Sequence, residues 1–292
     1  MSIPKEFIKK KRLPVYFSSK LSGYYDDREA RNLASWVIEH LTGKSSLEIM
    51  LGNEEWGKKE EEIIEVILER LQCGNPIQQI LGYTEFFGLK LDLDPEVLIP
   101  RNETEELVEW VLTDKICTTK GCKILDIGCG SGAISLALSK SLPDAMVYAV
   151  DVSDKALKVS IMNAERLMLN FCCGKMDILN PSGIFSEMKY DVIISNPPYV
   201  LESQKPLLES RVSEKEPSIA LFVPDNDPLL FYRAISEFAD KRLKPGGGVY
   251  VEINEQLPQE TMGEFDKRFA VSELRKDIHG RYRMIKASNG KK

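Results

Sequence analysis

The amino-terminal part of the chain has the hydrophobic spacing of helices. Between residues 26 and 72 apolar residues recur at intervals of three and four, first in a segment that Gly43 closes and then in a Glu-rich segment at 58–71. Positions three and four apart share one face of a helix, so this pattern predicts amphipathic helices. Gly74-Asn75-Pro76 follows as a turn signal. We therefore predict a small helical domain over residues 1–76.

The next stretch has the spacing of a strand. In residues 85–94 three leucines alternate with polar residues, which is the period of a half-buried β-strand. We expect this stretch to be one arm of a β-hairpin and assign residues 77–100 as a β-hairpin linker. A helix should begin at Thr104, because glutamates crowd its first turn, where the helix dipole favours negative charge.

From Cys122 onward, strand-like and helix-like segments alternate. The short apolar runs predict strands at 123–127, at 146–152, shortly before Asp177, at 191–195 and at 248–253. Helices fill the gaps, and one at 153–169 has Ser153 as a plausible cap. This order predicts an α/β fold with a doubly wound, Rossmann-like and largely parallel sheet over residues 101–292. Ligands of such sheets bind at the carboxyl ends of the strands.

Two glycine and proline signals fall inside this region. Gly246-Gly247-Gly248 is expected to be a turn ahead of the last of these strands. The strand at 191–195 ends on Asn196-Pro197-Pro198-Tyr199, where proline removes two backbone donors, so a rigid turn should follow it. A strand with an ordinary proline turn is the structural alternative to a functional site here.

Composition limits the class of protein. The chain has 292 residues, of which 43% are hydrophobic, enough for one large domain and a small one. It shows neither a signal peptide nor an apolar run of membrane-spanning length, so we expect a cytoplasmic protein without membrane contact. The six cysteines form no Cys-x-x-Cys and only two histidines exist, so we expect reduced thiols and no metal site. With a net charge of −6, no direct nucleic-acid binding is expected.

The Asn196-Pro197-Pro198-Tyr199 turn has the groups needed to hold a planar NH2 nucleophile. The lone pair of such a nitrogen is delocalised, so both N–H groups need acceptors while the nitrogen rehybridises. The Asn196 side-chain oxygen can accept one and the Pro197 carbonyl the other. The ring of Tyr199 offers a face for the planar group. Positioning and oriented dipoles of this kind can each contribute several kcal/mol without a general base.

A glycine loop follows the first strand of the sheet. Gly128-Cys129-Gly130-Ser131-Gly132 lets the backbone approach a ligand closely, and Asp151 ends the next strand, where a carboxylate can accept ribose hydroxyls. Asp177, after the third strand, could lie near an adenine or be a plain turn residue. The loop together with Ala133 also fits the G-x-G-x-x-G/A fingerprint of a dinucleotide site.

Asp126 distinguishes two possible ligands of this loop, a dinucleotide and S-adenosyl-L-methionine. A carboxylate two residues before the first glycine would repel a pyrophosphate, whereas it attracts the cationic amino and sulfonium groups of S-adenosyl-L-methionine. Together with the Asn196 turn, this favours S-adenosyl-L-methionine as the cofactor.

These two motifs resemble those of class I S-adenosylmethionine-dependent amino-methyltransferases. The flanking sequence resembles one branch of them, the peptide chain release factor glutamine methyltransferases (HemK/PrmC type), and the resemblance covers nearly the whole chain. The stretches that carry it are residues 76–88, 97–101, 103–105, 216–217, 220–221, 275–277 and 280–281. One departure is Asn102, which stands where the family usually has a proline; asparagine is a competent residue at a helix start.

The resemblance implies a function and a set of site residues. A methyl group would pass directly from S-adenosylmethionine to the side-chain nitrogen of the glutamine in the Gly-Gly-Gln tripeptide of class 1 peptide chain release factors. The helical domain and hairpin would help to hold that protein, and we expect a monomeric enzyme. The expected cofactor contacts are Asp126, Gly128, Cys129, Gly130, Ser131, Gly132, Asp151, Asp177 and Asn196, and the expected glutamine site is Asn196, Pro197, Pro198 and Tyr199.

Three other functions stay open on the sequence. A sibling enzyme could methylate a glutamine of a ribosomal protein by the same chemistry. A nucleic-acid enzyme could methylate the exocyclic amine of adenine with an equivalent site, although it would have to grip phosphates and extract its base. A partner-binding protein could retain the fold without catalysis, which the intact motifs disfavour.

Overall fold

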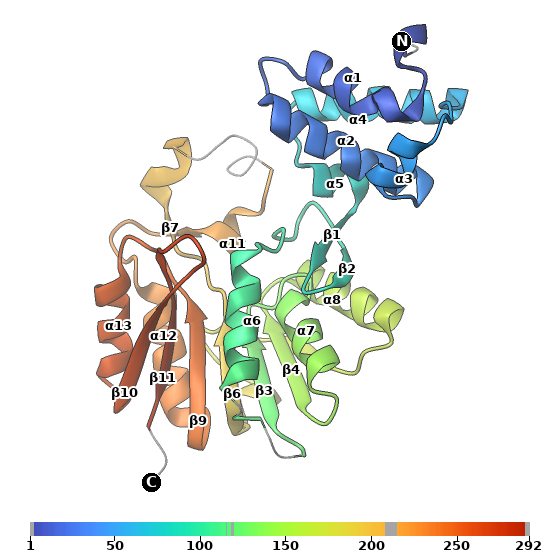
Figure 1. Ribbon diagram of the computed structural model, residues 1–292. Coiled ribbons are helices and arrows are strands. Elements are labelled where there is room, and N and C mark those ends of the chain that lie inside the picture. Colours follow the sequence, from blue (N-terminus) through green and yellow to red (C-terminus); the bar gives the residue numbers. More distant parts are fainter. Residues whose placement is uncertain (1–2, 115, 118–119, 208–214, 290–292) are drawn as a thin grey trace. The chain divides into compact units, whose positions relative to one another are not determined.

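The chain divides into two compact units. The computed structural model describes residues 3–114, 116–117, 120–207 and 215–289, and contacts within it separate Met1–Gly82 from Tyr83–Lys292 (Figure 1). The domain boundaries predicted from the sequence, at residues 76 and 100, differ from this one because they treat residues 77–100 as a separate hairpin linker. That division stays a prediction. Within the described ranges, no helix has the length and apolar character needed to cross a membrane.

The first unit is a set of helices around one apolar core. Asp26 caps α2 by accepting the Glu29 amide, and Gly43 ends this helix with a φ of 66°. The two helices predicted from the hydrophobic spacing are confirmed as α2 and α4, whose apolar faces supply most of the core. The helical elements are η1 (Lys5–Phe7), η2 (Lys10–Arg12), α1 (Leu13–Lys20), α2 (Asp27–Thr42), α3 (Ser46–Leu51), α4 (Lys58–Gln72) and α5 (Ile77–Leu81).

The second unit starts with a β-hairpin. β1 (Tyr83–Phe86) and β2 (Leu89–Asp92) pair antiparallel, and the two residues between them, Phe87 and Gly88, both have positive φ. Two positive φ values match the right-handed twist of the strands in a two-residue turn. The single strand predicted over 85–94 is therefore wrong, because that stretch contains the turn and parts of both arms.

A mixed but mainly parallel sheet forms the centre of the second unit, which confirms the predicted α/β class. In the part of the chain that the structure describes, the sheet has seven strands in the order β10-β11-β9-β6-β3-β4-β5. The run from β9 to β5 is parallel, and β11 is antiparallel to both of its neighbours. The strands are β3 (Lys123–Ile127), β4 (Met146–Asp151), β5 (Cys172–Lys175), β6 (Tyr190–Ser195), β9 (Leu243–Glu252), β10 (Val271–Lys276) and β11 (Tyr282–Ser288).

Helices cover both faces of this sheet (Figure 1). The longer ones are α6 (Glu103–Thr113), α7 (Ala133–Ser141), α8 (Asp154–Leu167), α12 (Leu230–Arg242) and α13 (Pro258–Asp266). The shorter elements are α9 (Ile184–Glu187), β7 (Val200–Leu201), η3 (Glu202–Leu207), α11 (Ser218–Leu221) and β8 (Phe222–Val223). Ser153 caps α8 as predicted, by accepting the Ala156 amide. Asn102 stands before α6 but makes no side-chain cap.

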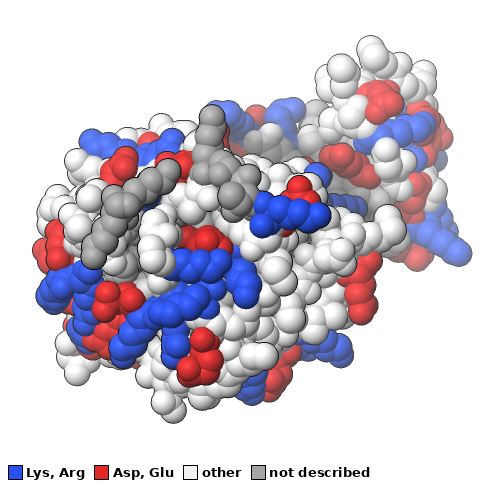
Figure 2. All heavy atoms as spheres, turned by 90° about the horizontal axis from the view of Figure 1, so that it is seen from below, with Lys and Arg blue, Asp and Glu red and all other residues white. Residues whose placement is uncertain are grey.

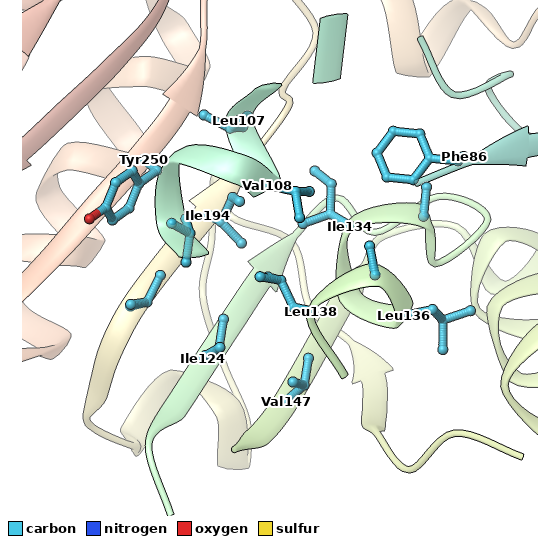
Figure 3. Close-up of a cluster of buried hydrophobic side chains, with 14 of the residues drawn as sticks. Phe86, Leu107, Val108, Ile124, Ile134, Leu136, Leu138, Val147, Ile194 and Tyr250 are labelled. Atoms are coloured by element: carbon cyan, nitrogen blue, oxygen red, sulfur yellow. The ribbon is translucent and has the colours of Figure 1, made fainter. Parts of the chain in front are cut away.

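The alternation of side chains along the strands creates two separate cores. On one face Ile124, Ile194 and Tyr250 pack under α6 and α7, with Phe86 of the hairpin in the same cluster (Figure 3). On the other face Leu125 and Ile193 pack against α12 and α13. Successive strand residues point to opposite faces, and both faces are buried here. The central strands are therefore apolar at nearly every position.

The predicted turn at Gly246-Gly247-Gly248 is wrong. These glycines lie inside β9, where Gly246 has a φ of 78° and the pairing with β6 shifts register between Tyr190 and Val192. A Cβ on Gly247 would lie 2.7 Å from the Asp191 carbonyl oxygen, so the strands could not approach as they do. The glycine run is a bulge that lets β9 continue past β6.

The expectation of six reduced thiols is also wrong for one pair. Cys117 and Cys122 form a disulfide, with their Cα atoms 5.3 Å apart, where the chain enters β3. That separation is within the range a disulfide spans. Four residues are free cysteines: Cys73, Cys129, Cys172 and Cys173.

Charges of both signs are mixed on one face of the molecule. Figure 2, seen from below the view of Figure 1, shows lysine or arginine side chains next to aspartate or glutamate side chains on that face. Near the starts of β6 and β9, Lys244 pairs with Asp191 at 2.6 Å and Arg242 with Glu187 at 3.1 Å. Interspersed charges of this kind form no extended field of one sign.

Candidate active site

The two predicted motifs meet at the switch point of the sheet. From β3 the chain continues to β4 and β5 on one side, and then returns to β6 on the other side of β3. Ile127 and Ser195 are register partners, so the loops after β3 and β6 start side by side. Ligands of doubly wound sheets bind at this position.

A cavity of about 290 Å³ lies at these carboxyl ends. Of the residues singled out from the sequence, those that line it are Gly128, Cys129, Gly130, Ser131, Asp151, Asp177, Asn196, Pro197 and Pro198. Asp126, Gly132 and Tyr199 lie outside its lining. Further walls come from α6 and the segment before it, from α11 and its N-cap residue, and from α12. They include Glu96, Val97, Pro100, Thr104, Pro217 and Phe231.

The glycine loop is fixed by its own backbone. Gly128, Gly130 and Gly132 have φ values of 78°, 55° and 85°, a region that side chains rarely adopt. The amides of Gly128 and Cys129 both donate to the Val150 carbonyl on β4. Gly132 is needed for packing as well, because a Cβ there would lie 3.1 Å from atoms of Leu136 and Ser160.

Asp151 ties the loop to the end of β4. Its Oδ2 accepts the Gly130 amide at 2.9 Å and its Oδ1 accepts the Ser153 amide at 2.8 Å. Burial raises the pKa of Asp151, whereas these backbone donors lower it. Each carboxylate oxygen keeps a second lone pair, so Asp151 can still accept hydroxyl groups from a ligand in the cavity.

Two buried polar atoms beside the loop have no protein partner among the described residues, Ser131 Oγ and Asp126 Oδ1. Ser131 lines the cavity. Asp126 is fully buried, accepts both the amide and the hydroxyl of Ser135, and has its pKa raised to about 7 by burial. Buried atoms without partners are costly, and those at a cavity are commonly satisfied by a ligand or water. Direct contact between Asp126 and a cofactor stays a prediction.

Asn196 is held by a residue that the sequence analysis did not single out as a site residue. Its Nδ2 donates to Thr104 Oγ1 at 3.1 Å, and Thr104 Oγ1 donates to Glu252 Oε2 at 2.6 Å. The other Glu252 oxygen, Oε1, accepts the Tyr199 hydroxyl at 3.0 Å. One buried carboxylate therefore connects the end of β9 to both ends of the Asn196–Tyr199 turn.

Tyr199 is held by contacts outside the cavity lining. Its ring packs against the apolar cluster under α12 and α13, and its backbone carbonyl accepts Asn254 Nδ2 at 3.0 Å. Burial raises the pKa of its phenol, which therefore stays protonated and can donate to Glu252. A stacking role for the ring stays a prediction, while the observed contacts make Tyr199 an anchor of the turn.

Glu252 was missed although the sequence holds a signal for it. Val249-Tyr-Val-Glu252-Ile is an apolar strand with one carboxylate at its end, in a position that points to the same face as Tyr250. Buried carboxylates are rare unless paired or functional, and strand ends are where ligands bind. Asp126 shows the same pattern at the end of β3.

Known proteins resemble both units of the chain. A model described as the PrmC N-terminal domain matches residues 15–82, and one described as the methyltransferase small domain matches residues 107–212. A release factor glutamine methyltransferase of Flavobacterium psychrophilum is 39% identical over 95% of this chain and 98% of its own length. A protein of the same name from Bacteroides thetaiotaomicron is 38% identical over 95% and 99%.

A solved structure resembles the fold. A methyltransferase from Pyrococcus furiosus superposes with a TM-score of 0.50 at 19% identity, covering 76% of this chain and 97% of its own. This likeness concerns the arrangement of the strands and helices alone.

Proposed function

The chain belongs to the family of release factor glutamine methyltransferases, and we propose that it methylates the side-chain amide nitrogen of a glutamine in a class 1 release factor. The proposal places that glutamine in the Gly-Gly-Gln tripeptide and takes the methyl group from S-adenosylmethionine. The observation that carries it is the Asn196 amide, which lines the cavity with Nδ2 committed to Thr104 and therefore with Oδ1 as its available acceptor.

S-adenosylmethionine fits the chemistry of the cavity. Three carboxylates line it, Glu96, Asp151 and Asp177, and their charge attracts a sulfonium and repels a pyrophosphate. When bound, the cofactor supplies a methyl group made electrophilic by the positive sulfur. We propose that Asp151 accepts the ribose hydroxyls, that the unpartnered Ser131 hydroxyl and the glycine-loop backbone hold the polar end of the molecule, and that Asp177 lies near the adenine.

The glutamine amide is proposed to bind at the start of the Asn196 turn. Asn196 Oδ1 accepts one of its N–H groups and the Pro197 carbonyl accepts the other, which leaves the nitrogen lone pair free to point at the methyl group. The two prolines fix φ, so these acceptors are in place before the substrate binds. The positive charge on the nitrogen after transfer makes its protons acidic, and one of them leaves to water.

The labelling experiment that tests this function uses a purified class 1 release factor and a copy whose Gly-Gly-Gln glutamine is changed to alanine. Methyl-labelled S-adenosylmethionine is expected to label the first protein and not the second. Label on ribosomal proteins or on DNA instead would assign the chain to one of the sibling functions. Cofactor binding without transfer to any of these acceptors would contradict an enzymatic role.

A further inference from the structure

Glu252 accepts two hydroxyl groups and donates to neither. Its two oxygens take the Thr104 hydroxyl at 2.6 Å and the Tyr199 hydroxyl at 3.0 Å. An ionised carboxylate has no hydrogen, so both hydroxyls must act as donors toward it. Thr104 and Tyr199 are therefore both donors in their hydrogen bonds to Glu252.

That direction continues to Asn196. A threonine hydroxyl has one hydrogen, and Thr104 uses it on Glu252. Its oxygen can then only accept, which is why the NH2 end of the Asn196 amide, and not the oxygen, lies 3.1 Å from it. Because the two ends of a planar amide diverge, Oδ1 is turned away from Thr104.

We propose that Glu252 is a positioning residue, which acts through Thr104 to keep Asn196 Oδ1, rather than Nδ2, facing the substrate. This inference rests on the proposed function, since it concerns the acceptor for the glutamine amide. An Asn196 side chain flipped end for end would present two donors to a substrate NH2 group that also only donates. A flipped amide therefore repels the substrate at the reacting atom.

The surroundings of Glu252 suit a residue that orients the hydrogen bonds of Thr104 and Asn196 rather than one that stabilises the fold. The side chain is 1% exposed, and burial raises the pKa of its carboxyl, an effect that the two hydroxyl donors and the charge of Arg283 partly offset. Arg283 makes its own direct ion pairs with Asp277 and Glu255. A buried carboxylate held by hydroxyls is an expensive way to fill a core position. Side chains with a hydroxyl or an amide group can donate as well as accept, whereas an ionised carboxylate can only accept. This property explains why a glutamate stands at position 252.

The test changes the donor and acceptor pattern at position 252 while keeping the size of the side chain. Glu252→Gln has the same size but keeps only one acceptor oxygen. An NH2 group facing Tyr199 would leave the phenol hydrogen without the acceptor it now has. We therefore expect the NH2 group to face Thr104, whose hydroxyl then accepts from it and is free to donate to Asn196 Oδ1. We expect kcat for methyl transfer to fall about 100-fold, as for loss of one oriented group at a reacting centre. The KM for S-adenosylmethionine should change less than about twofold, because Glu252 does not line the cavity.

Variants at Thr104 give an independent test of the same path. Thr104→Val removes the hydroxyl with little change in shape and should lower kcat about as much as Glu252→Gln. Thr104→Ser restores the hydroxyl and should keep most of the activity. The double variant Glu252→Gln with Thr104→Val should have a kcat no lower than that of either single variant, because both substitutions break the same hydrogen-bond path to Asn196. Glu264→Gln is the matched control, since Glu264 is also a buried glutamate but lies on α13 and pairs with Lys267.

The outcomes separate this inference from the proposed function. Absence of methyl transfer by the unaltered protein sinks the proposed function and with it this role. Transfer by the unaltered protein with undiminished kcat in Glu252→Gln, or in Thr104→Val, overturns the inference alone. A fall in kcat that Thr104→Ser shares, or one that is additive in the double variant, also overturns it, because it points to lost packing. Thermal melting with and without cofactor identifies any variant that fails to fold.

Discussion

The guanidinium of Arg101 lies on the buried carboxylate of Glu216, with 2.7 Å between Nη2 and Oε1. The second oxygen of Glu216 accepts the Ile99 amide at 3.2 Å. Pro100 and Pro217, beside these residues, line the cavity. A pair separated by 115 residues in sequence thus joins two walls of the candidate site.

Arg101→Met should destabilise the protein. The Glu216 side chain is 1% exposed, so removing its charge partner leaves a carboxylate in the interior with only one donor. We expect a loss of about 2 kcal/mol in the free energy of unfolding, less than for a fully buried pair because Arg101 is itself 34% exposed. Urea denaturation measures it. Arg281→Met, which removes an exposed partner of Glu255, should cost less than about 0.5 kcal/mol, and equal losses in the two variants would contradict the assignment.

Asp126 should make stability depend on pH near neutrality. Burial raises its pKa to about 7 in the folded protein, above the usual value of the unfolded chain. The neutral form is therefore the favoured folded form, so the contribution is complete below about pH 4 and is lost as the pH rises to about 7. Asp126→Asn cannot ionise, and from about pH 4 to pH 7 the unaltered, ligand-free protein should lose stability relative to it, with no further loss above that range. Urea denaturation across this range checks the prediction, and a pH-independent difference would contradict it.

Asp151→Asn should weaken cofactor binding far more than it slows transfer. Asp151 accepts the Gly130 amide and the Ser153 amide, and an NH2 group at either oxygen position would face a donor. It would also lose an acceptor for the ribose. We expect the Kd for S-adenosylmethionine, from titration calorimetry, to rise about 10- to 100-fold, with kcat at saturation little changed. The control is Asp154→Asn, three residues further on, whose carboxylate is exposed and paired with Lys175; it should bind normally.

Asn196→Ala should show the opposite split. If Asn196 holds the amide during transfer, kcat should fall about 100-fold or more while the Kd for the cofactor stays within about twofold. Single-turnover transfer and calorimetry measure the two quantities. Equal losses in both would mean that Asn196 mainly supports the cavity wall.

Local patterns predicted the parts of the fold that depend on local chemistry. The apolar runs at 123–127 and 191–195 became β3 and β6, because their two-sided burial leaves few alternatives. The glycine loop and the Asn196 turn were placed at the carboxyl ends for the same reason. The turn at Phe87 was missed, because a phenylalanine with positive φ has no signal in its own identity.

The relationships that set up the site are long-range and could not be read from spacing. Thr104 and Glu252 are 148 residues apart, and only the pairing of β9 with β6 brings Glu252 to the Asn196 turn. Arg101 and Glu216 meet in the same way. A carboxylate at the end of an apolar strand can be noticed in the sequence, but its partners depend on the strand order.

The most direct test of the account is the position of the methyl group in the product. A class 1 release factor from the same organism is incubated with the protein and S-adenosylmethionine, and its peptides are analysed by mass spectrometry, with Asn196→Ala as the control enzyme. The account predicts one added methyl group on the glutamine side chain of the Gly-Gly-Gln tripeptide, formed rapidly by the unaltered protein and far more slowly by the variant. A methyl group on another residue, or an unmodified release factor beside a methylated ribosomal protein or adenine, would contradict it.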